Sequence, residues 1–229
     1  MDQFRHRALS LNPRYLISSL VLVLLSLMLV RPATADINEP RVLLEDVTHQ
    51  MIRSINQRQA EIKQNPEVAK QLVEELLLPH IDLITASRWV LGKYWRRASK
   101  EQKLAFIRHF REMLLRFYST ALADYLRENT VDEKLITFDP VRAEAGSDDV
   151  TVHSEVHPPN GKVIPVNYHM HLTRKGWKVY DVSVEGISVI TTYRTSFASE
   201  IREHGLDGLI SRLADKNNSL VQQPPKPTT

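Results

Sequence analysis

Apolar residues recur every three or four positions in several stretches of the chain, and this spacing predicts helices. Residues 41–63 carry one such stripe, and residues 66–78 should form a second helix. Asn65 and Pro66 mark the start of that second helix, because Asn is a good N-cap and Pro fits the first helical position. The helix should end before Pro79. The first stripe consists of Leu44, Val47, Met51 and Ile55.

A short helix and then the longest helix of the chain should follow. Asp82 can cap a helix that runs to Leu91, and the sequence Ser99-Lys-Glu-Gln is a capping box that opens a helix reaching about Glu128. The apolar stripe of this long helix is wider than one contact seam, which indicates burial against more than one element or against a ligand. The stripe consists of Phe106, Phe110, Leu114, Leu115, Phe117, Tyr118, Leu122 and Tyr125.

Residues 149–157 and 162–172 instead alternate between apolar and polar side chains, which predicts two strands. The Pro-Pro-Asn-Gly sequence at 158–161 indicates a hairpin between them. Pairing Pro158 with Lys162 leaves a three-residue loop and keeps the apolar residues on a single face, whereas a slip by one residue would split that face. In this register Val156 lies opposite Ile164, Val152 opposite Tyr168, and Val150 opposite Met170.

Two further strands are expected, at 135–138 and 177–184, and helical spacing returns over 188–204. Gly205 would end that helix, and Asp207 would cap a last one through Leu213. Hairpin-linked strands with helices before and after them predict an α+β fold. We therefore expect a twisted antiparallel sheet of about four strands packed against several helices.

The N-terminus has the order of a secretory signal peptide: a basic leader, an apolar core over 16–30, and the small-x-small site Ala33-Thr-Ala35. We expect cleavage after Ala35, since a core of about fifteen residues is shorter than the roughly 20 needed to span a bilayer. Residues 36–215 would then form one exported domain. The polar, Pro-rich tail at 216–229 should be disordered.

Charge and composition narrow the function. Removing residues 1–35 leaves 26 basic and 26 acidic side chains, so the net charge of the whole chain, +3, belongs to the leader. A balanced charge argues against nucleic-acid binding, which needs clustered positive charge. The chain has no Cys, which excludes disulfides and cysteine-ligated metals.

Catalytic and metal motifs are weak. Gly186-Ile-Ser188-Val-Ile190 resembles a nucleophile elbow, but the last position should be Gly. Four histidines share one face of the hairpin, and a solvated polar face explains them better than a zinc site. They are His153, His157, His169 and His171. We expect neither catalysis nor a metal or cofactor, with an ester or lipid hydrolase kept as an alternative.

Three segments together resemble the MlaC (toluene-tolerance) family of phospholipid-binding proteins. They are residues 78–102, from Leu-Pro-His-Ile-Asp onward; residues 106–125, with the aromatic stripe; and residues 177–210, which contain Trp-Lys-Val-Tyr-Asp-Val-Ser-Val-Glu-Gly-Ile-Ser. Each motif alone is modest, but their order and spacing are specific, and the similarity covers roughly residues 40–215.

The resemblance implies a monomeric periplasmic carrier that holds phospholipid tails between the sheet and its helices. Members of the family exchange lipid with an outer-membrane lipoprotein–porin complex and with the lipid-binding hexamer of an inner-membrane ABC transporter, which maintains outer-membrane lipid asymmetry. A periplasmic adaptor with a closed core remains an alternative, because a filled core and a lined cavity need the same apolar faces. The candidate lining residues are Phe110, Leu114, Tyr118, Val152, Val166, Tyr168, Met170, Val182, Val184, Val189 and Tyr193.

Overall fold

The computed structural model describes residues 39–144, 146–159 and 161–221, and all of them belong to the unit Asp36–Thr229. The signal peptide expected at 1–35 and the last eight residues, 222–229, lie outside the described residues. So does Asn160 in the expected hairpin loop.

The helices follow the predicted order. Helix α2 spans Glu39–Gln64, α3 spans Glu67–Leu72, α4 spans Leu83–Leu91, and α5 spans Lys100–Glu128. The capping box at the start of α5 is confirmed. The Ser99 Oγ accepts from Gln102 N at 3.1 Å, and Gln102 Oε1 accepts from Ser99 N at 3.0 Å. Asp82 caps α4 as expected, since its Oδ1 accepts from Thr85 N at 2.9 Å.

The strands form one antiparallel sheet in the order β1-β2-β3-β4-β5. They span Ile136–Phe138, Asp149–Val156, Ile164–Thr173, Gly176–Val184 and Ile187–Ser188. The predicted hairpin register is confirmed at all three pairs, Val156 with Ile164, Val152 with Tyr168, and Val150 with Met170. The expected count of about four strands is one short, because the two-residue strand β5 is too brief to produce an alternating pattern.

A β-bulge in β4 keeps its apolar residues on one face. The pairing of β3 with β4 shifts between His169 and Met170, so that Tyr180 becomes an extra residue in β4. Odd-numbered Trp177 and Val179 therefore face the same side as even-numbered Val182. Bulges of this kind often stand next to functional sites.

Two helical stretches meet at Gly205, as predicted, and the second one extends beyond its expected end at Leu213. Helix α6 spans Val189–Val221, with a kink at Gly205, where φ is 72° and ψ is 174°. Residues 216–221, which belong to the tail expected to be disordered, form the last turns of this helix. The end of the helix is held by contacts that the polar composition did not indicate: Leu213 is buried, and Asn217 Nδ2 donates to His109 O at 3.0 Å.

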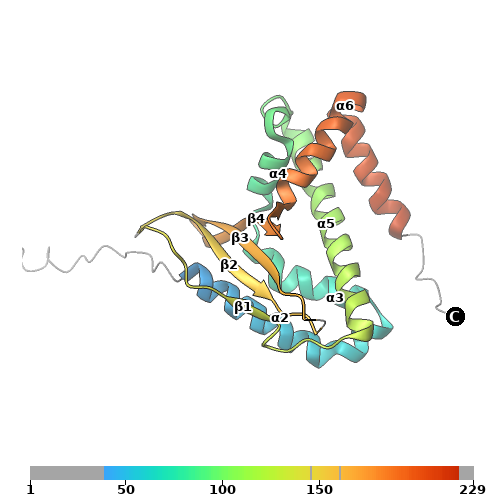
Figure 1. The fold of residues 1–229 in the computed structure, drawn as a ribbon. Coiled ribbons are helices and arrows are strands. Elements are labelled where there is room, and N and C mark those ends of the chain that lie inside the picture. Colours follow the sequence, from blue (N-terminus) through green and yellow to red (C-terminus); the bar gives the residue numbers. More distant parts are fainter. Residues whose placement is uncertain (1–38, 145, 160, 222–229) are drawn as a thin grey trace, which may run out of the picture. The chain divides into compact units, whose positions relative to one another are not determined.

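Helix α2 runs along one face of the sheet, as Figure 1 shows, and it contacts β1 and β4 there. Leu44 of α2 packs there with Val150, Val152 and Met170 in one buried cluster. A second cluster joins α2, α3 and the later part of α5, and a third joins α4, α6 and the start of α5 around Phe106. Within the described residues, no helix combines the length and the apolar character needed to cross a membrane.

Candidate functional site

An apolar cavity of about 340 Å³ lies where these three clusters meet. Its volume falls in the range of about 300–1,000 Å³ found for small-molecule sites. The walls come from the irregular segment after α3, from α4 and α5, from β4, and from the first turn of α6. The lining residues are Val73, Leu77, Leu78, Ile81, Leu83, Ala86, Phe110, Arg111, Leu114, Leu115, Tyr118, Val179, Tyr180, Asp181, Val182, Val184, Val189 and Ile190.

Helix α5 supplies one wall because its apolar residues repeat at helical spacing. Phe110, Leu114 and Tyr118 are four residues apart, so they lie on one face. Phe110 is fully buried at one end of this row, and Tyr118 is 44% exposed at the other. The row therefore runs from the protein interior to solvent.

The wall opposite α5 is not a regular helix. After α3 the chain turns through the π-helical segment η1, Val73–Leu77, and then the 3-10 segment η2, Leu78–His80, where Pro79 prevents the α-helix from continuing. Leu77 and Leu78 thereby point at the cavity. π-Helical turns inside helices are often found at functional sites.

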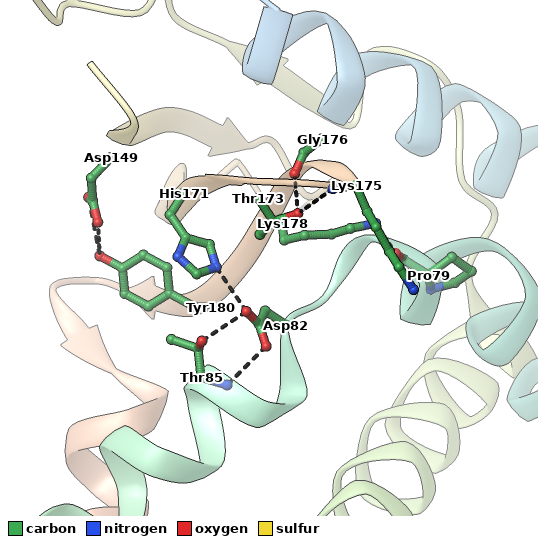
Figure 2. A network of polar contacts seen from close by, with 10 residues as sticks. All are labelled: Pro79, Asp82, Thr85, Asp149, His171, Thr173, Lys175, Gly176, Lys178 and Tyr180. Atoms are coloured by element: carbon green, nitrogen blue, oxygen red, sulfur yellow. Dashed lines mark hydrogen bonds and ion pairs between the residues drawn. The ribbon is translucent and has the colours of Figure 1, made fainter. Parts of the chain in front are cut away.

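A polar network fixes this wall to the sheet (Figure 2). Asp82 Oδ2 accepts hydrogen bonds from His171 Nε2 at 3.0 Å and from Thr85 Oγ1 at 2.8 Å, and Asp82 N donates to Val179 O at 2.8 Å. Lys178 Nζ donates to Pro79 O at 2.6 Å. The position of Ile81 and Leu83 in the cavity wall therefore depends on contacts with β3 and β4.

Partial burial of Asp82 works against its charged form, but its hydrogen bonds outweigh this effect. The backbone and side chain of Thr85, and then His171, lower the pKa of Asp82 below its ordinary value. The carboxylate is therefore charged at neutral pH, which favours its interaction with the N-terminus of α4.

Ser188 has a structural role that differs from that of a nucleophile. Its Oγ donates to Asp181 Oδ2 at 2.6 Å and accepts from Thr191 N at 3.0 Å, while Asp181 Oδ1 accepts from Ile190 N at 3.0 Å. The serine and the aspartate together cap α6 at the edge of the cavity. A hydrolytic serine needs a neighbouring base that can take its proton. The base beside Ser188 is the Asp181 carboxylate, and its Oδ1 already accepts from the backbone N–H groups of Ile190 and Val182.

The histidines lie on the face of the sheet that is opposite to the apolar face. His153 Nδ1 is 2.7 Å from Asn167 Oδ1, and His169 contacts Thr151 and Ser183. His157 contacts Thr137, and His171 contacts Asp82. Across the described residues, no group of three His, Cys, Asp or Glu side chains has the geometry to hold a metal ion.

The structure brings six of the eleven candidate lining residues to the cavity. They are Phe110, Leu114, Tyr118, Val182, Val184 and Val189. Burial is the largest of the effects that raise the pKa of the Tyr118 hydroxyl, with a smaller contribution from Asp181, so this group stays neutral at the exposed end of the row.

Five candidates do not line the cavity, and packing explains why. Val152 and Met170 are fully buried in the cluster that includes Leu44 of α2, and Tyr168 packs on the same cluster. Val166 is buried in the sheet opposite Val184. Tyr193 packs against Phe110 and Phe197, with ring centres 5.4 Å and 5.5 Å apart, in the α4–α6 cluster. These five predicted residues therefore do not line this cavity, because each packs in a buried cluster or in the sheet instead.

The segment 73–86 supplies six lining residues that were not among the predicted ones. A signal for it exists, because the three consecutive leucines at 76–78 are more than one helical stripe can bury. Val179 of β4 could also have been found from the sequence. The apolar residues of this strand change from odd to even positions, and the bulge explains this change.

The model of the MlaC protein family matches residues 45–215. The chain belongs to the MlaC protein family. Among relatives of this MlaC-family chain is the intermembrane phospholipid transport system binding protein MlaC of Haemophilus influenzae, 28% identical over 200 residues, which are 85% of this chain and 89% of that protein. Another is the toluene tolerance protein ttg2D of Pseudomonas putida, 28% identical over 84% of this chain and 90% of the relative.

A solved structure also resembles this MlaC-family chain. It is a phospholipid-binding protein from Ralstonia solanacearum in complex with a phospholipid, with a TM-score of 0.69 and 28% sequence identity. The likeness covers 79% of this chain and 98% of that protein. The fold class expected from the sequence, α+β with an antiparallel sheet, agrees with this comparison.

Proposed function

We propose that this protein is a periplasmic carrier of phospholipids in an intermembrane transport system. The observation that supports the proposal most strongly is the apolar cavity that the side chains leave unfilled, in a fold whose solved relative holds a phospholipid. The name of the Haemophilus influenzae relative supports the transport role.

The physical requirement for such a carrier is an apolar lining. Each CH₂ group that leaves water gains about 0.8 kcal/mol, so two chains of roughly sixteen carbons would cost on the order of 25 kcal/mol if they crossed water bare. Leu114, Leu77 and Val182 line the cavity from three different elements, so an acyl chain between them would be removed from water on several sides. The lining must not bind the lipid far more tightly than a bilayer does, or release would fail.

Carriage of a lipid needs no catalytic step. The proposal therefore assigns Ser188 and Asp181 to the capping of α6, and it assigns the lining residues to solvation of the tails. We propose further that the protein acts as a monomer. Its partners would be an outer-membrane lipoprotein–porin complex and the lipid-binding hexamer of an inner-membrane ABC transporter, with which it would exchange lipid and so maintain outer-membrane lipid asymmetry.

A transfer experiment tests the proposal. Delipidated protein is incubated with donor vesicles that contain a fluorescent phospholipid, and the protein is then separated from vesicles by gel filtration. The expected result is that labelled phospholipid elutes with the protein at about one molecule per chain and is delivered to acceptor vesicles. Protein that elutes without lipid would contradict the carrier function and favour an adaptor role.

A further inference from the structure

One charged side chain interrupts the apolar row that α5 presents to the cavity. Arg111 lies three residues before Leu114 and seven before Tyr118, so it occupies a cavity-facing position of the helix. Among the described lining residues, only Arg111 and Asp181 carry charge. The carboxylate of Asp181 is occupied by the cap of α6, which leaves Arg111 as the charged group available to a ligand.

Arg111 is held by two carboxylates from different elements. Its Nη2 donates to Glu74 Oε1 at 2.8 Å, which joins α5 to the π-helical segment η1, and its Nη1 donates to Glu112 Oε1. The side chains of Glu74 and Arg111 are each 32% exposed, and that of Glu112 is 30% exposed. In this Glu74–Arg111–Glu112 cluster, Arg111 lines the cavity and all three side chains are partly exposed to water.

The cluster has the charges of a binding site for a zwitterion. A guanidinium has five N–H donors, and the described contacts use one on each of Nη1 and Nη2, so donors remain for a phosphate oxygen. A primary ammonium beside that phosphate would meet the carboxylates of Glu74 and Glu112. An anionic headgroup without an ammonium would gain the same contact with Arg111 but would be repelled by both carboxylates.

Building on the proposed carrier function, we propose that the Glu74–Arg111–Glu112 cluster selects phospholipids whose headgroup combines a phosphate with a primary ammonium over anionic phospholipids. The tails would occupy the cavity beside Leu114, and the phosphate would lie against Arg111 at its edge. Because the cluster remains partly in water, the selection should be modest. Ion pairs at this exposure give about a threefold preference rather than a hundredfold one.

The test is a competition between two lipids with identical tails. Delipidated protein is loaded from vesicles that contain equal amounts of phosphatidylethanolamine and phosphatidylglycerol, and native mass spectrometry then gives the ratio of the two lipids bound. We expect about threefold enrichment of phosphatidylethanolamine in the wild type. The Glu74→Gln, Glu112→Gln double variant should lose the enrichment or favour phosphatidylglycerol, because the two repelling charges are gone.

Two further variants keep the result interpretable. Arg127→Gln removes a cation from the last turn of the same helix, where Arg127 Nη1 lies 3.5 Å from Asp124 Oδ1. Arg127 does not line the cavity, so this variant should keep the wild-type ratio of the two lipids. Glu112→Gln alone preserves the Glu74–Arg111 contact between η1 and α5. If the double variant does not fold, this single variant should shift the ratio in the same direction by a smaller factor.

The possible outcomes separate the two proposals. Equal binding of both lipids by the wild type, or a ratio unchanged in the glutamate variants, would overturn the headgroup site and leave the carrier function standing. Failure of the wild type to bind either lipid would overturn the carrier function and the headgroup site with it.

Discussion

Val152 and Val182 form a matched pair that tests which part of the sheet faces a ligand. Both lie on the apolar face, and each is paired with Tyr168 of β3 from opposite sides. Val152 is fully buried in the cluster that contains Leu44 of α2, whereas Val182 lines the cavity. The same substitution, valine to phenylalanine, should therefore have opposite consequences at the two positions.

The magnitudes follow from the space available. Enlarging valine to phenylalanine adds roughly two water-sized volumes, about 60 Å³. At Val182 this volume enters a cavity of about 340 Å³. Filling a cavity raises the free energy of unfolding by up to about 24 cal/mol per Å³, which gives at most about 1.4 kcal/mol here. At Val152 no space exists, and overpacking should lower the free energy of unfolding by about 1–3 kcal/mol.

Lipid binding should change in the other direction. A ring at position 182 excludes about two methylene groups of a tail, which weakens binding by about 1.6 kcal/mol, or roughly fifteenfold. Urea unfolding of delipidated protein measures the first effect, and titration with a fluorescent phospholipid measures the second. If Val182→Phe destabilised the protein as much as Val152→Phe and left lipid affinity unchanged, the cavity beside β4 would not be the lipid site.

Three other substitutions test residues at the ends of α4 and α6. The pKa of Asp82 is lowered in the folded protein, so its charge stabilises the fold above about pH 3.8, and this contribution is lost as the pH falls through the folded-state pKa. The urea midpoints of the wild type and of Asp82→Asn should therefore differ at pH 7 and converge in acid. A difference that stays constant with pH would contradict this assignment. Ser188→Ala should cost about 0.5–2 kcal/mol of unfolding free energy as a lost helix cap while lipid transfer continues, and complete loss of an ester-hydrolysing activity on this substitution would instead identify a nucleophile. Gly92→Ala should lower the free energy of unfolding by about 1–3 kcal/mol, because φ is 52° and ψ is −119° at this position and a side chain strains such a backbone. A steric clash would not be the cause, since the atom nearest to a new Cβ is 3.9 Å away. An unchanged melting temperature would refute the strain.

Local rules predicted much of the fold because the sequence satisfies them at several levels. The hairpin register followed from keeping Val150, Val152 and Val156 on one face, and the start of α5 followed from Ser99 and Gln102. Strand β5 could not be predicted in this way, since it is two residues long and exists only because β4 is beside it. The end of α6 depends on tertiary contacts such as that of Asn217 with His109, which no local pattern contains.

The cavity was only partly predictable for a related reason. Alternation identified the apolar face of the sheet, but it did not determine which part of that face would pack against Leu44 of α2, so Val152 and Met170 were grouped with residues that border the cavity. The wall at 73–86 depends on the change from α to π and 3-10 geometry before Pro79. That change is a response to packing and leaves little trace in the periodicity.

The central claim is that side chains leave an apolar space between β4, α5 and the segment after α3, and that lipid tails fill it. A high-resolution crystal structure of the protein purified without added lipid measures this directly. The account predicts elongated electron density of co-purified tails in contact with Leu77, Leu114 and Val182. A centre closed by these same side chains, with no such density, would contradict it.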